Sequence, residues 1–190
     1  MVKHIVYLHG FNSSPLSTKA QQFVAAMAQD YPQVQVYVPH LSTWPAQAMQ
    51  EVVSMVQELD GDVAFVGSSL GGFYATWLAH KFATKAVLIN PAVRPDLLLQ
   101  DMLGPQSSYH TDDGEYDLTV THLDQLANLL VDPLTDADKL LVLLQTADET
   151  LDYREAANWY AASHLDIEQG GSHAYDNFPQ RIPQIMLFVG

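Results

Sequence analysis

Short apolar runs alternate along this chain with longer segments that have the periodicity of an amphipathic helix. The central runs are continuously apolar, which is typical of parallel strands that are buried on both faces. In the intervening segments apolar residues recur every three or four positions, so each segment has one apolar helical face. This alternation predicts an α/β fold, with a mostly parallel sheet of about six strands and helices on both faces. The strands are expected at residues 4–8, 34–38, 63–66, 86–89, 140–144 and 165–168.

Length, charge and cysteine content limit the classes of protein to which the chain can belong. Its 190 residues give room for a single domain, 1–190, rather than for two independent cores. Eight Lys and Arg residues against 22 Asp and Glu residues give a formal net charge of −14, which disfavours binding to nucleic acids and anionic membranes. The chain has no cysteine, and this excludes disulfides, thiolate catalysis and cysteine-ligated zinc.

The N-terminal apolar run is too short for a signal peptide, and no run approaches the roughly 20 apolar residues of a membrane-spanning helix. We therefore expect a cytoplasmic protein without a membrane span. The sequence does not indicate its oligomeric state.

One long segment interrupts the alternation of strands and helices. Between the strands at 86–89 and 140–144, roughly fifty residues contain no convincing strand, and they include a polar stretch at 104–117. An insertion of this length in a compact domain usually forms helices of its own and often covers a site. We expect a small helical cap at about residues 95–135. Most of its leucines should pack the cap onto the core, and a minority should face the covered site as an apolar pocket.

The strongest functional signal is the segment Gly67-Ser68-Ser69-Leu70-Gly71, which follows an apolar strand and opens a helix. This setting is typical of the nucleophile elbow of α/β-hydrolases, a Gly-x-Ser-x-Gly turn. The turn leaves almost no room for side chains two positions before and after the nucleophile, so glycine is needed at both. It lifts the hydroxyl of Ser69 above the sheet edge, where a base can reach it. Ser68 is the competing nucleophile, although it occupies the variable position of the motif, and an ordinary Gly/Ser-rich turn would look the same.

The loop after the first predicted strand has the sequence His9-Gly10-Phe11. In a fold with a nucleophile elbow, a loop of this kind donates one backbone N–H to the oxyanion hole, and the residue after the nucleophile donates the other. The expected donors are therefore Phe11 and Leu70. His9 is expected to brace the loop rather than to act as the base, because the chain order Ser, Asp, His requires a later histidine.

Two later segments supply an acid and a base, each directly after a predicted strand. Asp148 follows the fifth strand, where a carboxylate can orient the imidazole of the base and stabilise its charged form. Glu149 and Asp152 are nearby alternatives for this role. His173 follows the last strand and two glycines, which suit a turn that projects the imidazole across the sheet edge. Together with Ser69 these residues occur in the order Ser, Asp, His, each at the C-terminal end of a predicted strand.

On these residues the chain resembles the YqiA-type esterases, a compact bacterial branch of the α/β-hydrolases. The resemblance implies a nucleophile at Ser69, an acid at Asp148, a base at His173 and a sheet that lacks the first antiparallel strands of larger relatives. Ala147 stands where the family pattern has glycine, which leaves the neighbouring carboxylate in place. The matching stretches extend from end to end of the chain, at residues 7–15, 66–77, 90–95, 145–154 and 170–174.

The function that these residues indicate is hydrolysis of carboxylic esters by a two-step acyl-enzyme route, which needs no metal or organic cofactor. Acyl thioesters would be cleaved by the same residues. A second class is a non-catalytic protein of the same fold that binds a ligand or partner, since fold alone does not establish activity. Such proteins usually lack the serine or the histidine, and both are present here.

Arg94 is a candidate for substrate binding, because it follows the strand at 86–89 near the expected site and could contact a carboxylate or phosphate. The alternative is an ion pair between cap and core in a chain that is rich in acidic residues. The excess of acids favours the ion pair.

Overall fold

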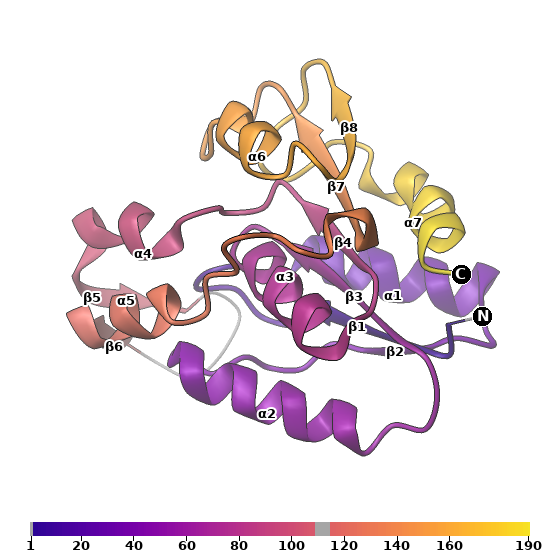
Figure 1. The fold of residues 1–190 in the computed structure, drawn as a ribbon, viewed down its shortest axis with the longest axis horizontal. Helices are drawn as coiled ribbons and strands as arrows, with labels where there is room; N and C mark the ends of the chain where they lie inside the picture. The colour runs from indigo at the N-terminus through magenta and orange to yellow at the C-terminus, as the bar shows by residue number, and fades with distance from the viewer. Residues whose placement is uncertain (1, 109–114) are drawn as a thin grey trace.

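The computed structural model of the chain describes residues 2–108 and 115–190 and contains a six-stranded sheet in which every strand pair is parallel (Figure 1). The order across the sheet is β2-β1-β3-β4-β7-β8. All six strands expected from the sequence are present, which confirms the predicted α/β fold. The strands are β1 (His4–Leu8), β2 (Gln35–Tyr37), β3 (Val63–Ser68), β4 (Ala86–Ile89), β7 (Leu140–Gln145) and β8 (His164–Glu168).

Helices cover both faces of the sheet, as the sequence predicted. Successive side chains of a strand point to opposite faces, so β3 and β4 contribute to two separate cores. Phe65 and Leu88 pack with α2, α3 and α6, whereas Val66 and Val87 pack with α1 and α7 on the other face. The bounds of these helices are α1 (Thr18–Asp30), α2 (Pro45–Gln57), α3 (Leu70–Phe82), α6 (Tyr153–Trp159) and α7 (Ile182–Val189). None of the described helices is long and apolar enough to span a membrane.

The segment between β4 and β7 forms the expected helices and also a feature that the sequence did not predict. Its described part contains a two-stranded antiparallel sheet in which Gly104 pairs with Leu118. Gly and Pro begin the first of these strands, and both strands are largely polar, so neither has the composition of a buried strand. Residues 109–114 of the polar stretch lie outside the described residues. The elements are α4 (Pro95–Leu98), η1 (Gln100–Met102), β5 (Gly104–Ser107), β6 (Glu115–Leu118), α5 (Val120–Ala127) and η2 (Ala137–Lys139).

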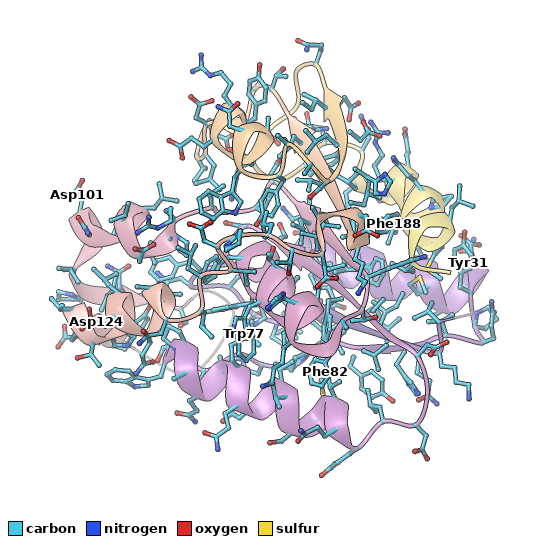
Figure 2. The ribbon with its side chains drawn as sticks, viewed as in Figure 1. Tyr31, Trp77, Phe82, Asp101, Asp124 and Phe188 are labelled. Carbon is cyan, nitrogen blue, oxygen red and sulfur yellow. The ribbon has the colours of Figure 1, made fainter. Side chains whose placement is uncertain are left out.

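The insertion lies at one end of the molecule, where α5 packs against α4 and α2 (Figure 1). Its outer surface carries the exposed carboxylates of Asp101 and Asp124 (Figure 2). Its inner side is attached to the rest of the chain by the buried ring of His122, which stacks on Trp44 with a centroid distance of 3.8 Å. The insertion is therefore fixed to the segment that leads into α2.

The hairpin β5–β6 is also bonded to the loop that follows β1. The Asn12 side chain donates from Nδ2 to Gln106 Oε1 over 3.1 Å and accepts at Oδ1 from the Tyr116 hydroxyl over 2.7 Å. Asn12 follows the predicted oxyanion donor Phe11, so these two bonds connect the insertion to the candidate site.

Candidate active site

Ser69 lies in a sharp turn between β3 and α3 and has backbone angles of φ 57° and ψ −122°. A residue other than glycine rarely has a positive φ, and such strain is common where a fold presents a functional side chain. A Cβ atom at Gly67 would collide with the backbone of Gly71, and one at Gly71 would collide with the backbone of Leu8. The two glycines are thus needed for the reason that the motif predicted.

The elbow is held in place by its own backbone. The Ser69 N–H donates to the Ile89 carbonyl over 3.0 Å, and the Ser69 carbonyl accepts from Gly72 over 2.9 Å and from Ala92 over 3.1 Å. Both serines line the cavity described below, but Ser68 is only 4% exposed whereas Ser69 is half-buried. The hydroxyl of Ser69 is therefore less deeply buried than that of Ser68, as expected if Ser69 is the nucleophile of the motif.

The loop after β1 lies directly beside the elbow. A Cβ atom at Gly10 would be 3.4 Å from Ser69 Cβ, so glycine allows this close approach. Phe11 and Leu70 both line the cavity, and the N–H of neither is a donor among the backbone hydrogen bonds of the described residues. Two N–H groups without a backbone acceptor beside a serine hydroxyl are what an oxyanion hole would need, so the roles predicted for Phe11 and Leu70 stay open to test.

His9 braces this loop from below. Its Nδ1 lies 3.1 Å from the Gly10 carbonyl, which can only accept, and its Nε2 accepts from the Leu41 N–H over 3.2 Å. One nitrogen donates and the other accepts, so these contacts require the neutral imidazole with its proton on Nδ1. Burial lowers the pKa of His9 to about 4, with an additional effect in the same direction from His40, against the opposing hydrogen bond to Gly10.

Asp148 and His173 are in direct contact. His173 Nδ1 lies 2.8 Å from Asp148 Oδ2, and the Asp148 side chain is 2% exposed. Asp148 Oδ1 accepts from the N–H groups of Thr150 and Leu151, each over 2.8 Å. Burial acts to raise the pKa of the Asp148 carboxyl, but the hydrogen bonds from His173, Leu151 and Thr150 outweigh it and hold that pKa below its usual range. An ionised Asp148 keeps the imidazole proton on Nδ1 and leaves Nε2 free to accept a proton.

The two alternative acids make different contacts. Glu149 Oε2 accepts from the backbone N–H of His173 over 2.9 Å, so it supports the loop and does not reach the imidazole through this contact. Asp152 pairs with Arg154 over 2.6 Å and caps α6 by accepting from the Arg154 N–H. Of the three carboxylates, Asp148 is therefore the one that is bonded to the histidine ring.

Two buried amide side chains hold the loop that carries His173. Asn90 and Gln145, at the C-terminal ends of β4 and β7, are 2% and 1% exposed. Asn90 Nδ2 donates to the Ser172 carbonyl over 3.0 Å and to the His173 carbonyl over 3.4 Å. Gln145 Oε1 accepts from the N–H of Ser172 over 3.0 Å and from that of Asp176 over 2.8 Å.

Gln145 also explains the glycine two positions before His173. A Cβ atom at Gly171 would collide with the Gln145 side chain, and Gly171 has φ +77°. Sequence reasoning placed the two glycines in a turn but missed Asn90 and Gln145 as its supports. The available signal was a polar amide at the end of each of two otherwise apolar strands.

Ser69 and His173 line one cavity of about 1050 Å³ at this edge of the sheet. Its two sides differ in character. The insertion contributes apolar residues, namely Pro95, Leu98, Leu99 and Met102, whereas the start of α1 contributes the polar residues Ser17, Thr18, Lys19 and Gln22.

Arg94 forms a local ion pair. Its guanidinium donates to both carboxylate oxygens of Asp96, over 2.9 Å from Nε and 2.6 Å from Nη2. Its side chain is 39% exposed, and it is not among the described residues that line the cavity. An ion pair is thus present, within the insertion rather than between cap and core, and we do not include Arg94 in the substrate site.

The parallel sheet with a serine elbow between β3 and α3 is that of an α/β-hydrolase fold. The chain belongs to an uncharacterised protein family, UPF0227, whose profile matches residues 4–190. This match confirms the family resemblance found in the sequence. A UPF0227 protein of Shewanella sp. (strain MR-4) is 24% identical over 189 residues, which cover 97% of this chain and 98% of that protein.

Solved structures show the same fold at low sequence identity. Mouse alpha/beta hydrolase domain-containing protein 10 has a TM-score of 0.77 and 16% identity, with 98% of this chain and 89% of that chain covered. Est1E from Butyrivibrio proteoclasticus has a TM-score of 0.71 and 15% identity, with 98% of this chain and 87% of that chain covered. At these identities the likeness establishes the architecture, and function has to be argued from the site.

Proposed function

We propose that this chain is a serine hydrolase that cleaves carboxylic esters through an acyl-enzyme intermediate. The observation that carries the proposal is the 2.8 Å contact between Asp148 and His173 in a loop that shares one cavity with the elbow residue Ser69. An elbow serine, a histidine and a buried carboxylate are the three groups that acyl transfer needs. Their convergence from three separate segments of the chain has no evident purpose in a protein that only binds a ligand.

In the first step Ser69 Oγ attacks the carbonyl carbon of the ester while His173 Nε2 takes the hydroxyl proton. The oxygen of the tetrahedral intermediate accepts hydrogen bonds from the N–H groups of Phe11 and Leu70. Collapse of the intermediate breaks the ester C–O bond, and His173 gives its proton to the departing alcohol. Asp148 stabilises the imidazolium that exists between these two proton transfers.

In the second step water hydrolyses the acyl-enzyme. His173 Nε2 takes a proton from the water, the resulting hydroxide attacks the acyl carbonyl, and the carboxylic acid leaves as Ser69 recovers its proton. Every proton passes between Ser69, His173, water and substrate, so these steps use the chain's own residues alone.

The cavity supports a small acyl ester as the substrate. Leu98, Leu99 and Met102 of the insertion form an apolar side on which an acyl chain can be buried. Burial contributes about 0.8 kcal/mol for each CH₂ group, so this side should favour acyl groups longer than acetyl. Acyl thioesters fit the same chemistry, and a comparison of matched oxygen esters and thioesters would rank the two.

Labelling of Ser69 is the direct test. A fluorophosphonate probe should label the wild-type protein at Ser69, and the label should be located by mass spectrometry of the digested protein. Ser69→Ala should abolish labelling and lower kcat on 4-nitrophenyl esters by about 10⁴–10⁶-fold, because only binding and the oxyanion hole remain.

Ser68→Ala is the matched control, since it removes the adjacent hydroxyl from the same turn. It should retain labelling and most of the activity. If Ser68→Ala loses labelling and Ser69→Ala does not, the nucleophile is Ser68 and the assignment to Ser69 is wrong. A wild-type protein that binds esters but neither reacts with the probe nor hydrolyses them would instead support the non-catalytic binding protein.

A further inference from the structure

Lys19, in the first turn of α1, is the only Lys or Arg among the described residues that line the active-site cavity. It lines the cavity together with the polar residues Ser17, Thr18 and Gln22, and the insertion contributes apolar residues to the same cavity. Its Nζ atom donates to the carbonyl oxygen of His173 over 3.2 Å. The ammonium group is therefore beside the loop that carries the proposed base.

In the part of the chain that the structure describes, Lys19 has no carboxylate partner, unlike four of the other seven Lys and Arg side chains. Arg94, Lys139, Arg154 and Arg181 each pair with a carboxylate, as expected in a chain with 22 acidic residues. Lys19 takes part in none of the ion pairs found among residues 2–108 and 115–190. An ammonium has three protons to donate, and the His173 carbonyl uses one of them. The remaining protons are available to a ligand.

Partial burial of an ammonium without an ion-pair partner is costly, because the charged group loses hydration that one bond to a carbonyl does not replace. This burial lowers the pKa of Lys19 to about 8, although the negative charges of Asp148 and Glu149 act in the opposite direction. The group is still mostly protonated at neutral pH. An anion that enters the cavity would supply the missing partner.

We propose that Lys19 binds a carboxylate of the substrate, so that the preferred substrates are esters that carry a negative charge. The inference rests on the proposed ester hydrolysis and specifies its substrate class. The neutral part of such an ester would lie against Leu98, Leu99 and Met102, and its charged end would point toward α1. The net charge of −14 does not prevent this binding, because repulsion from distant surface charges is screened beyond roughly 8 Å at physiological ionic strength.

The carboxylate can belong to the acyl part or to the alcohol part of the ester, and two substrate pairs distinguish these sources. For the acyl part, mono-4-nitrophenyl succinate is compared with 4-nitrophenyl 4-methylpentanoate. The acyl group of the second ester has a similar shape, with an uncharged isopropyl group in place of the carboxylate. For the alcohol part, 4-acetoxybenzoate is compared with its methyl ester. The measured quantity is the ratio of kcat/KM between the charged and the neutral member of each pair, after subtraction of the uncatalysed rate.

In wild type this ratio should exceed one for at least one pair. Lys19→Met should lower that ratio by about tenfold or more, an effect typical of a partly desolvated charge pair, whereas Lys19→Arg should retain most of it. Lys19→Met also removes the hydrogen bond between Lys19 and the His173 carbonyl. Any loss of activity from this cause affects both substrates of a pair equally, so it cancels in the ratio. Lys85→Met is the matched control, because Lys85 also donates to a backbone carbonyl, that of Phe188, and does not line the cavity.

The preference should also depend on pH. It should weaken as pH rises through about 8, where Lys19 loses its proton. The other titratable groups near the ammonium are Asp148 and Glu149 on the loop after β7 and His173 and Asp176 on the loop after β8. An arginine keeps its charge throughout that range, so the same loss in Lys19→Arg would contradict the assignment.

A second measurement does not depend on catalysis. Titration calorimetry with succinate and glutarate should show binding to Ser69→Ala that is lost in the double variant Ser69→Ala/Lys19→Met. Equal binding by both proteins, or equal kcat/KM ratios in wild type and Lys19→Met, would overturn the inference. Normal probe labelling of Ser69 in the same protein would leave the proposed function intact. Dicarboxylate binding without labelling or hydrolysis would instead retain the anion site and reject the hydrolase.

Discussion

Asn90 and Gln145 show how single buried side chains can hold the loop of a proposed catalytic group, here His173. Gln145 uses its full hydrogen-bonding capacity, since its Nε2 also donates to Glu168 and to the Asp176 carbonyl, each over 3.0 Å. Asn90 Oδ1 accepts from the Gln145 backbone N–H over 3.0 Å, which joins the two residues. Networks of this kind are costly to leave half satisfied, so loss of one amide should displace the loop that they hold.

We expect Asn90→Asp to lower kcat on 4-nitrophenyl acetate by roughly 10–100-fold, because small misplacement of a reacting group has effects of this order. The substitution keeps the size of the side chain and tolerates the φ of 41° at this position, but it removes the donor to Ser172 and His173. KM should change far less than kcat. The proton shared by His173 and Asp148 should give a downfield NMR signal in wild type that shifts or broadens in the variant.

Gln145→Met should have a similar effect, because it removes the oxygen that accepts from the N–H groups of Ser172 and Asp176 and keeps the length of the side chain. The control is Thr76→Val, which removes a buried hydrogen bond between Thr76 and the Tyr160 hydroxyl, 2.9 Å long, outside the histidine loop. It should lower the melting temperature without changing kcat or the downfield signal. If all three variants lose activity in proportion to their stability, the two amides are structural and do not position His173.

These residues also show where sequence reasoning stops. The sequence predicted the contact between Asp148 and His173, since an acid and a histidine at the ends of neighbouring strands must meet at one edge. It did not predict that Asn90 supports Ser172, which is 82 residues away, because a lone amide gives no sign of its distant partner. Lys19 was missed for the same reason: nothing in its local sequence shows that it lacks a carboxylate partner.

At the scale of whole elements, burial decides what could be predicted. The six strands of the parallel sheet were found because most are continuously apolar, and β1 and β4 have the expected bounds. The hairpin β5–β6 was not found, since its pairing depends on backbone bonds and on contacts of Gln106 and Tyr116 with Asn12 rather than on an apolar pattern. That the insertion acts as a cap over the substrate remains a prediction.

The insertion permits a test at this scale, because α4 and η1 place similar side chains inside and outside the cavity. Leu98 and Met102 line the cavity and are 40% and 41% exposed. Met102→Ala and Leu98→Ala should lower kcat/KM for hexanoyl esters by several-fold for each CH₂ group of the acyl chain that is no longer buried, and should leave acetyl esters nearly unchanged. The preferred acyl length should therefore shorten in a series of 4-nitrophenyl esters.

Leu97→Ala is the control for this prediction, since Leu97 lies in the same helix, is 50% exposed and does not line the cavity. It should leave the chain-length profile as in wild type. If all three variants keep the wild-type dependence of kcat/KM on acyl length, then Leu98 and Met102 do not contact the acyl chain.

For the molecule as a whole, His9 couples the loop after β1, the proposed oxyanion loop, to global stability through pH. Its pKa is about 4 in the folded chain against 6.5 for an ordinary histidine, mainly because it is buried. Between these values the unfolded chain binds a proton that the folded chain does not, so folding becomes less favourable as pH falls from 6.5 toward about 4. Burial also lowers the pKa of His122 in the cap, which acts in the same direction.

Urea unfolding at a series of pH values should therefore show a free energy of unfolding that falls by on the order of 2–3 kcal/mol as pH is lowered from above the ordinary histidine pKa to near that of His9. His9→Gln should be less stable at neutral pH, because its amide cannot reproduce both contacts, with Gly10 and with Leu41. Its stability should vary less over the same interval, since the proton uptake by residue 9 in the unfolded chain is gone. His164→Gln is the matched substitution at an exposed histidine, at the start of β8, against which the slope of His9→Gln is compared. An equal slope in wild type and His9→Gln would mean that His9 takes up its proton without unfolding the chain and does not hold the oxyanion loop as the neutral imidazole.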